Sequence, residues 1–304
     1  MGTRSPGRPR SSPAVVRFEA PDGWRLAATR FDPEGPALGV VLAGHAMMAN
    51  ARSLDRPAGA GLASELAAAG FRVYALDVRG HGASDRGGSW TYDDIVRLEL
   101  PAAIRFVSGR HPGEPLAFLG HSLCGHAGLA ALARTPDLPV QAFVSLGSNV
   151  WIRRHEADPW TWRRKALTMA GTILACAAFG RLPVRLFRQG SEDEPRAYFA
   201  QMARWTRTDR WTGLDGFDYL AGLARVKSPV LAIAGSGDDL LCRPASSAAF
   251  HAHLTGTTVV HRVVEEGRPG HMDLVVRRIP SLRDEVVRWL AQKFATTKLE
   301  PSNS

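Results

Sequence analysis

The chain has 304 residues, 45% of them hydrophobic, which is enough for one large α/β domain with an insertion or for two modest domains. Its net charge of +9 comes almost entirely from arginines spread along the chain. No zinc-ligand spacing, RNA-binding aromatic signature or basic zipper pattern accompanies them, so we expect no nucleic-acid partner and no bound metal. Three widely separated cysteines (Cys124, Cys176 and Cys242) argue against disulfide bonds and favour a reducing, cytoplasmic compartment.

The first segments predict a tail followed by a β-hairpin. Residues 1–13 contain arginine, serine, glycine and proline without an apolar core, which indicates a disordered basic tail rather than a secretory signal. Two β-rich segments, 15–19 and 24–31, flank the turn signal Pro21-Asp22-Gly23, a pattern typical of an antiparallel hairpin. Residues 39–43 form a continuous apolar run, as expected of a buried strand.

Strands and helices then alternate up to residue 146. The helix predicted over 91–107 begins at Thr91, with Asp94 three residues later in a capping position. The other expected elements are helices at 57–69 and 127–134 and strands at 72–76, 116–119 and 140–146.

Residues 147–224 interrupt this alternation. They contain no convincing strand and hold five of the eight tryptophans, so we predict a mostly helical insertion. Alternation then resumes with strands at 230–234 and 258–264 and helices at 244–254 and 281–294. Short apolar strands that alternate with helices indicate an α/β fold with a mostly parallel sheet covered on both faces.

The longest apolar run, 166–179, lies inside the insertion and is too short to span a bilayer comfortably. Basic residues flank it at 163–165 and at 181, 185 and 188. Two interpretations are open: an interfacial helix in weak contact with a membrane surface, or a buried cap helix with solvated ends. We favour the buried helix.

The segment 116–125 carries the most specific signal. It indicates a strand, a sharp turn with Ser122 at its tip and the start of a helix, which is the arrangement of a nucleophile elbow. Gly120, two residues before the serine, suits a turn in which the helix backbone passes close by. Cys124 stands two residues after the serine, where the pattern usually has glycine.

A serine hydroxyl needs a base within hydrogen-bonding reach and an acid that orients the base. In this architecture the acid and the histidine follow the serine in that order, each in a loop after a later strand. His271 lies in a glycine-rich loop after the strand at 258–264 and is the expected base. Asp238 and Asp239 both follow the strand at 230–234, and we favour Asp238 as the acid.

Acyl transfer also requires amide donors for the developing oxyanion, because the loss of one donor typically lowers the rate about 10²–10³-fold. One expected donor is the backbone N–H of Leu123, directly after the serine. The other should come from the turn after the strand at 39–43, where we favour the N–H of Met47 over that of Ala46.

The chain resembles the α/β-hydrolase superfamily, especially its monoglyceride-lipase-like and serine-aminopeptidase-like esterases. Four blocks carry the resemblance, in the expected order: Gly44-His45-Ala46, Asp77 to Ser84, Gly120-His121-Ser122-Leu123, and the late pair Asp238 and His271. The resemblance gives the second block a structural role and no catalytic one.

The resemblance implies an α/β-hydrolase core at 14–146 and 225–296, a helical cap at 147–224 and a flexible tail at 297–304. It also implies a serine hydrolase that needs no cofactor and cleaves carboxylic esters of a fairly apolar small molecule through an acyl-enzyme intermediate. An acyltransferase, a thioesterase or an amidase would use the same residues. A non-catalytic binding protein of the same fold is the alternative outside the enzymes.

Overall fold

The computed structural model describes residues 12–299, so the expected tails at 1–13 and 297–304 lie largely outside the described residues. One eight-stranded sheet forms the centre of the fold, in the order β1-β2-β4-β3-β5-β6-β9-β10. Only β1 and β2 run antiparallel to their neighbours, so the sheet is mostly parallel, as predicted. The strands are β1 Ala14–Glu19, β2 Arg25–Phe31, β3 Val40–Gly44, β4 Arg72–Asp77, β5 Leu116–His121, β6 Ala142–Leu146, β9 Val230–Gly235 and β10 Val259–Val264.

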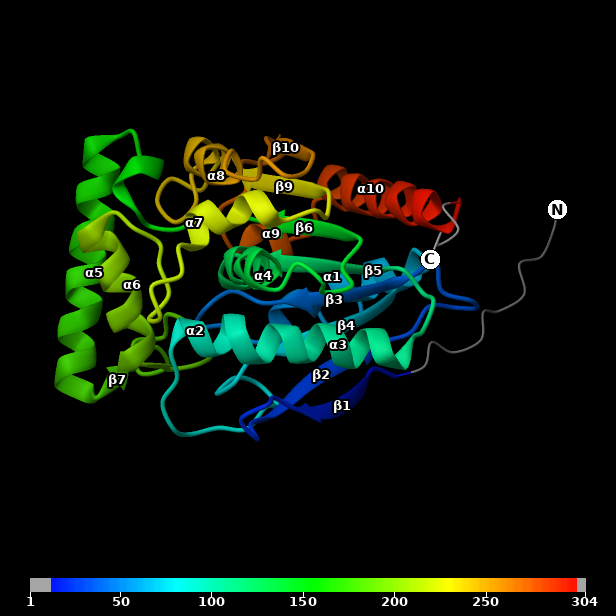
Figure 1. The fold of residues 1–304 in the computed structure, drawn as a ribbon, viewed down its shortest axis with the longest axis horizontal. Coiled ribbons are helices and arrows are strands. Elements are labelled where there is room, and N and C mark those ends of the chain that lie inside the picture. The colour runs from blue at the N-terminus through cyan, green and yellow to red at the C-terminus, as the bar shows by residue number, and fades with distance from the viewer. Residues whose placement is uncertain (1–11, 300–304) are drawn as a thin grey trace.

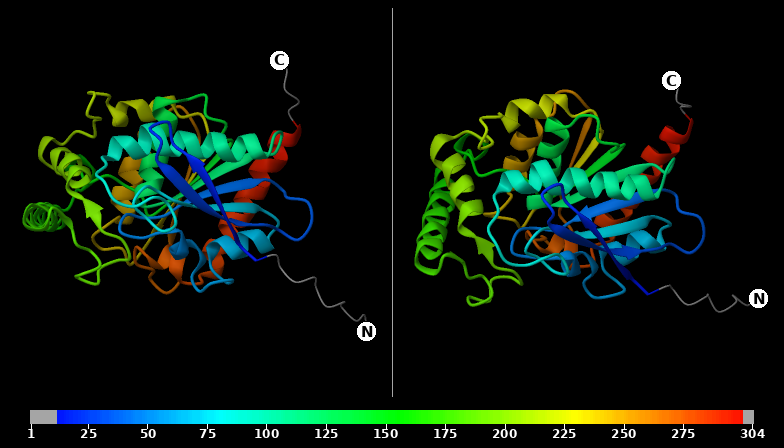
Figure 2. Two further views of the ribbon diagram at one scale, coloured as in Figure 1. Left: turned by 90° about the horizontal axis from the view of Figure 1, so that it is seen from below. Right: turned by 60° about the horizontal axis from the view of Figure 1, so that its bottom comes forward.

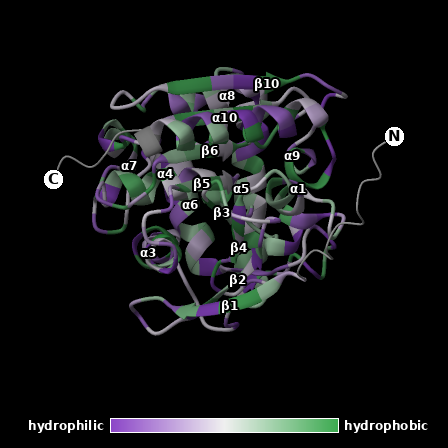
Figure 3. Ribbon diagram, turned by 90° about the vertical axis from the view of Figure 1, so that its right-hand side faces the viewer, coloured by the Kyte–Doolittle hydropathy of each residue, from purple (hydrophilic) through white to green (hydrophobic). Residues whose placement is uncertain are grey.

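Helices cover both faces of the sheet (Figure 1). α1, α9 and α10 contribute to one buried hydrophobic cluster, and α3, α4 and α8 contribute to another. In Figure 3, α3 and α10 carry both hydrophilic and hydrophobic residues, as expected of helices that bury one side. These helices are α1 Leu62–Ala68, α3 Leu100–Arg110, α4 Leu123–Arg134, α8 Pro244–His251, α9 Asp273–Val276 and α10 Pro280–Leu299.

The central strands position the candidate catalytic loops. Every residue of β3, β5, β6 and β9 is buried, which is typical of strands covered on both faces. β3, β5 and β9 lie in parallel in the sheet, so the turns after them open at the same edge. At that edge lie the turn after Gly44, the elbow after His121 and the loop after Gly235.

Several predicted helices differ from the structure at their ends: the helix expected at 127–134 begins at Leu123, for example, and the one expected at 244–254 ends at His251. The helix predicted at 57–69 begins only at Leu62, because the Asp55 carboxylate accepts the N–H groups of Gly59 and Gly61 and holds the residues between as a turn. The final helix continues to Leu299, so residues 297–299 are helical rather than part of a tail.

The capping interaction predicted at Thr91 is confirmed. Its hydroxyl accepts the N–H of Asp94, and the Asp94 carboxylate accepts the N–H of Thr91. The helix that starts there, α2 Tyr92–Asp94, continues through a π-helical turn at Ile95–Glu99 into α3.

The insertion between β6 and β9 is mostly helical, as predicted. It contains α5 Pro159–Phe179, α6 Arg196–Thr208 and α7 Tyr219–Gly222. Two short strands, β7 Arg181–Leu182 and β8 Glu194–Pro195, pair antiparallel where we expected no strand, because a two-residue strand leaves no periodic pattern in the sequence. In Figure 1 and in both views of Figure 2, α5 forms the outer edge of the insertion, and α6 lies between α5 and the rest of the fold.

The expectation that the apolar helix of the insertion is buried is wrong. α5 packs on α6 and β7 through one narrow side, formed by Thr161, Lys165, Met169 and Cys176. No described element covers the opposite side, where Leu167 and Leu174 are exposed. Among the helices of residues 12–299, none is long and apolar enough to cross a membrane.

Candidate active site

Ser122 occupies the turn between β5 and α4, with backbone angles of φ 51° and ψ −109°. A residue other than glycine at positive φ stores strain of about 1–3 kcal/mol, and such residues cluster at functional sites. The turn is tight because a side chain on Gly120 would collide with the backbone of Cys124 and Gly125. This geometry is that of the predicted elbow, and it lifts the serine above the end of β5.

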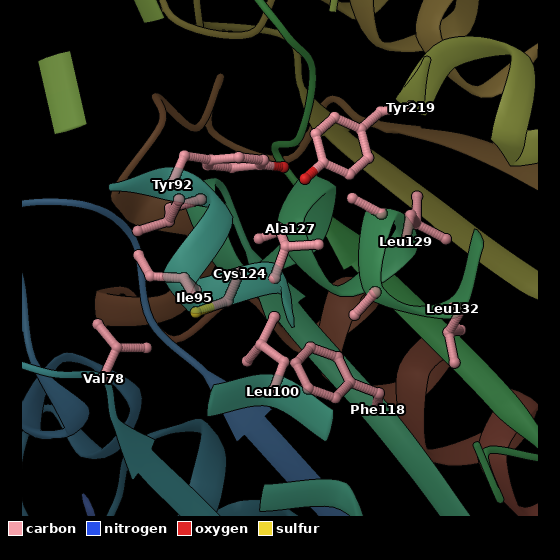
Figure 4. Close-up of a cluster of buried hydrophobic side chains, with 14 of the residues drawn as sticks. Val78, Tyr92, Ile95, Leu100, Phe118, Cys124, Ala127, Leu129, Leu132 and Tyr219 are labelled. Atoms are coloured by element: carbon pink, nitrogen blue, oxygen red, sulfur yellow. The ribbon is translucent and has the colours of Figure 1, made fainter. Parts of the chain in front are cut away.

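Cys124 replaces the usual glycine of the elbow without disturbing it. Its side chain is buried in the core cluster beside Ile95 and Leu100 (Figure 4). A Cβ atom added to Gly44 would lie 2.5 Å from the Cβ of Cys124 and 2.7 Å from its Sγ. The absence of a side chain at Gly44 therefore makes room for the cysteine. Burial raises the pKa of the Cys124 thiol, which keeps it protonated and unreactive.

The structure brings Asp238 and His271 together. The Nδ1 of His271 lies 2.6 Å from the Oδ2 of Asp238, and the other carboxylate oxygen accepts the N–H of Leu241 at 2.8 Å. Burial tends to raise the pKa of Asp238, but the hydrogen bond and charge of His271 and nearby N–H donors lower it below its usual value. Asp239, the alternative acid, is exposed to solvent.

His271 lies beside the elbow through contacts on both sides of Ser122. The N–H of Ser122 donates to the carbonyl of Leu146, and a side chain on the next residue, Gly147, would lie 3.4 Å from the His271 ring. On the other side, the Nε2 of His121 donates to the carbonyl of His271 at 3.0 Å. The hydroxyl of Ser122 makes no hydrogen bond to the part of the chain that the structure describes.

His121 therefore supports the loop that carries His271, the candidate base. Burial, together with the neighbouring His271, lowers the pKa of His121 to about 3. The ring is neutral at physiological pH and serves as a hydrogen-bond donor to the backbone. A neutral donor suits this buried position, since a charge there would be costly to desolvate.

The turn after β3 presents the candidate oxyanion donors. Within residues 12–299, the N–H groups of Ala46, Met47 and Leu123 donate to no other group. The next N–H in the turn, that of Met48, donates to the Oε1 of Glu194 at 2.8 Å. Met48 itself has a positive φ of 60°, so this turn is held in a sparsely populated conformation.

His45 anchors the start of the same turn. Its Nδ1 donates to the carbonyl of Ala46 at 2.7 Å, and its Nε2 accepts the N–H of Val78 at 3.3 Å. Burial and the neighbouring His81 lower the pKa of His45 to about 3, so the ring is neutral and can both donate and accept.

Two buried carboxylates of the insertion, Glu192 and Glu194, were missed by the sequence analysis. Glu194 accepts from Met48 and lies 3.1 Å from the Nε2 of His81. Glu192 accepts from the Nδ2 of Asn50 and the N–H of Gly82. Together they tie the insertion to the turn after β3 and to the block from Asp77 to Ser84.

The sequence did contain a signal for this network. The acidic run Glu192-Asp193-Glu194 follows a stretch of more than thirty residues without any acidic side chain. Carboxylates are rarely buried in a fold unless they are paired with a cation or hydrogen-bonded. Glu192 and Glu194 are both buried.

The family model for serine aminopeptidases of family S33 matches residues 39–269. The matched range contains the turn after β3, the elbow and Asp238, and it ends two residues before His271.

Three known proteins illustrate the similarity. Human lysosomal acid lipase/cholesteryl ester hydrolase is 28% identical over 149 residues, which cover 42% of this chain and 37% of that protein. Human lipase member N is 32% identical over 110 residues, 33% of this chain and 28% of that protein. The chain thus spans about a third of the length of these curated relatives. An esterase of Pyrococcus furiosus has a similar fold, with a TM-score of 0.62, 15% identity, and 94% and 91% of the two chains covered.

Proposed function

Because this chain belongs to the serine aminopeptidase S33 family of α/β hydrolases, we propose that it is a serine hydrolase that cleaves carboxylic esters through an acyl-enzyme intermediate. The observation that carries the proposal is the 2.6 Å pair of His271 and Asp238, held beside the strained turn of Ser122. The names of the two human relatives, both lipases, support an ester with a fairly apolar acyl or alcohol part.

In the first half of the reaction, the Nε2 of His271 takes the proton of Ser122 as the serine oxygen attacks the ester carbonyl carbon. Asp238 holds the Nδ1 proton of His271 and stabilises the imidazolium that forms. The N–H groups of Leu123 and Met47 donate to the oxyanion, with Ala46 the alternative to Met47. When the intermediate collapses, the bond to the alcohol oxygen breaks and that oxygen takes the proton from His271.

In the second half, His271 takes a proton from water while the water oxygen attacks the acyl carbon of the acyl-enzyme. The bond from Ser122 to the acyl carbon then breaks, and the serine oxygen regains a proton from His271. The products are the carboxylic acid and the free enzyme. An acyltransferase would replace the water with an alcohol or a thiol, and a thioesterase or amidase would differ only in the leaving group.

Labelling with a fluorophosphonate probe tests the proposal. We expect the native chain to be labelled at Ser122, and Ser122→Ala to lose labelling and to lower the hydrolysis of short-chain aryl esters by roughly 10⁶-fold. Folded native protein that remains unlabelled would instead support a non-catalytic binding protein. A series of aryl esters of increasing acyl length then measures the acyl-chain preference.

The two aspartates provide a matched pair for the acid. Asp238→Asn should lower kcat by about 10⁴-fold, because the amide favours the wrong tautomer of His271. Asp239→Asn changes the exposed neighbour of Asp238, and we expect nearly native activity. The reverse order of the two effects would assign the acid to Asp239.

The state of the cysteines supports a reducing, cytoplasmic location. Cys124, Cys176 and Cys242 are all buried and unpaired within the described residues. Disulfides form and persist in oxidising compartments and are rare in cytosolic proteins. Localisation of the full-length chain with a small epitope tag tests this part of the proposal.

A further inference from the structure

The outer side of α5 carries a row of exposed apolar side chains. Trp160, Leu167 and Leu174 are 70%, 73% and 71% exposed, and their spacing of seven residues places them on one side of the helix. Two more exposed rings lie at the C-terminal end of α5 and just beyond it, on another side of the helix: those of Phe179 and Phe187, 6.0 Å apart. We call this set the α5 face: Trp160, Leu167, Leu174, Phe179, Leu186 and Phe187.

The exposed large hydrophobic residues of the chain are concentrated in the α5 face. Its members are six of the twelve exposed large hydrophobic residues of residues 12–299, although they fall within 28 consecutive positions. Single exposed apolar residues are normal on protein surfaces, whereas larger exposed apolar patches mark sites that contact another protein or a membrane.

The charge around the α5 face has a single sign. From Pro159 to Ser191 the chain has no acidic residue, and five exposed arginines border the face: Arg163, Arg164, Arg181, Arg185 and Arg188. The remaining cation of this stretch, Lys165, points inward and pairs with buried Glu156 at 2.9 Å. Beyond the far end of the face, Asp193 pairs with Arg185 at 3.1 Å.

This charge pattern favours one of two binding partners for the α5 face, a second copy of the chain or a lipid surface. A second copy of the chain on a two-fold axis would place arginines of one α5 against arginines of the other, in a parallel or an antiparallel arrangement, and like charges at an interface cost affinity. A surface of anionic lipids offers opposite charge to the arginines and an apolar interior to the leucines and aromatic rings.

We propose that the α5 face docks on a membrane surface that contains anionic lipids, with α5 parallel to the bilayer. A helix of 21 residues is about 31 Å long, and its inner side stays packed on α6 and β7, so the helix lies at the interface rather than spanning it. The ring of Trp160 beside the guanidinium of Arg163, at 5.0 Å, suits the boundary between headgroups and acyl chains.

The face is continuous with the segment that holds the turn after β3. Beyond Leu186 and Phe187, the N–H groups of Ser191 and Glu192 both donate to the carbonyl of Met48. Docking would therefore bring the segment that holds the turn after β3 toward the bilayer. If the chain is an ester hydrolase as proposed above, its substrate class is an ester whose acyl chain partitions into membranes.

Co-sedimentation with vesicles tests the docking of the full chain. We expect binding to vesicles of phosphatidylcholine with phosphatidylserine, weaker binding to phosphatidylcholine alone, and release by added salt. The double variant Leu167→Ser/Leu174→Ser should lower the partition coefficient at least about tenfold. Arg163→Gln/Arg164→Gln should lower it only on the anionic vesicles.

Leu214→Ser is the matched control, because Leu214 is also an exposed leucine of the insertion but lies outside the α5 face. It should bind like the native chain. Equal loss of binding in this control, or no binding to anionic vesicles at low salt, would overturn the proposal. A dimer in sedimentation equilibrium that Leu167→Ser/Leu174→Ser dissociates would assign the face to a second copy instead.

The experiment separates this inference from the proposed function. Ser122→Ala lacks the candidate nucleophile but keeps the α5 face, so it should bind the vesicles as the native chain does. Binding by an inactive native chain would refute the ester hydrolase and leave the docking surface intact. A chain that hydrolyses esters but does not bind the vesicles would refute the docking surface and leave the ester hydrolase intact.

Discussion

The Oε1 of Glu194 accepts the N–H of Met48 at 2.8 Å, and the same oxygen lies 3.1 Å from the Nε2 of His81. Glu194 belongs to β8 of the insertion, whereas Met48 follows the candidate oxyanion donor Met47. The insertion therefore fixes the conformation of the turn that would bind the oxyanion. This makes Glu194 a positioning residue for the proposed reaction.

Replacing Glu194 should affect the chemical step more than substrate binding. Glu194→Ala leaves the N–H of Met48 and the ring of His81 without their partner, so the N–H of Met47 loses its alignment. We expect kcat for aryl esters to fall about ten- to hundredfold with little change in KM, less than the loss of a whole oxyanion donor. Glu194→Gln keeps an acceptor for Met48 and should lose less.

Asp193→Ala is the control for Glu194, because Asp193 is the adjacent acidic residue but pairs with Arg185 at the surface. It should leave both kinetic constants near their native values. A rise in KM at constant kcat for Glu194→Ala, or an equal effect in the control, would show that Glu194 acts on substrate binding or on the fold alone.

The pairing of His81 predicts a loss of stability at alkaline pH. Burial alone would lower the pKa of His81, but the carboxylates of Glu194 and Glu192 raise it to about 9. The folded state thus holds a proton that the unfolded chain releases near pH 6.5. This contribution to stability is complete below about pH 6.5 and is lost as the pH rises to about 9.

Urea unfolding of the native chain at pH 6.5 and pH 9 measures this change. The free energy of unfolding should decrease over this interval, and Glu194→Gln should reduce the decrease, since it removes the charge that raises the pKa of His81. A pH-independent free energy of unfolding in the native chain would contradict the charged pair.

The other buried histidines predict the opposite behaviour in acid. Burial lowers the pKa of His45, His121 and His126 to about 3. The unfolded chain binds protons below about pH 6.5 while these rings stay neutral in the fold, so stability falls as the pH decreases from 6.5 toward 3. Each ring contributes up to about 1.4 kcal/mol per pH unit.

A titration of the folded chain followed by NMR checks the acid prediction. The ring protons of these histidines should keep constant chemical shifts from pH 8 down to the onset of unfolding. His126→Phe removes one of the titrating rings and should flatten the acid limb of the stability curve. Midpoints near pH 6.5 in the folded chain would contradict the buried neutral state.

Local patterns in the sequence were sufficient to predict the order of the fold and the geometry of the elbow. The central strands are short apolar runs, and Ser122, Asp238 and His271 follow β5, β9 and β10 in chain order, which is why the sequence predicted that they would gather at one edge. Glu194 escaped prediction because it acts on Met48 across 146 positions of the sequence. The acidic run around Glu194 indicates a buried or paired carboxylate, but no local pattern identifies Met48 as its partner.

The exposure of α5 could not be predicted for a related reason. An apolar run shows that a helix can be buried, but burial depends on which elements cover it. Here α6 and β7 cover one side only, and Leu167 and Leu174 remain exposed. The composition of the run was therefore compatible with both interpretations.

Gly44 and Cys124 lie against each other at the elbow, where the usual glycine is replaced by a cysteine. Gly44→Ala should destabilise the native chain by about 1–3 kcal/mol, because the new methyl group overlaps the Cβ and Sγ of Cys124. Cys124→Gly removes that overlap, at a cost of about 1 kcal/mol for glycine inside a helix. In this background Gly44→Ala should cost almost nothing further.

A double-mutant cycle by urea unfolding measures the coupling between the two positions, which should be about 1–3 kcal/mol in favour of the double variant. The control cycle pairs Gly44→Ala with Cys176→Gly, a buried cysteine of α5 outside this contact, and the two effects should add. Additivity in the first cycle would mean that the fold relaxes around the new methyl group without moving the cysteine. Coupling in the first cycle alone would establish that Gly44 and Cys124 compensate for each other. The elbow then accepts the side chain of Cys124 because the residue of β3 beside it, Gly44, has none.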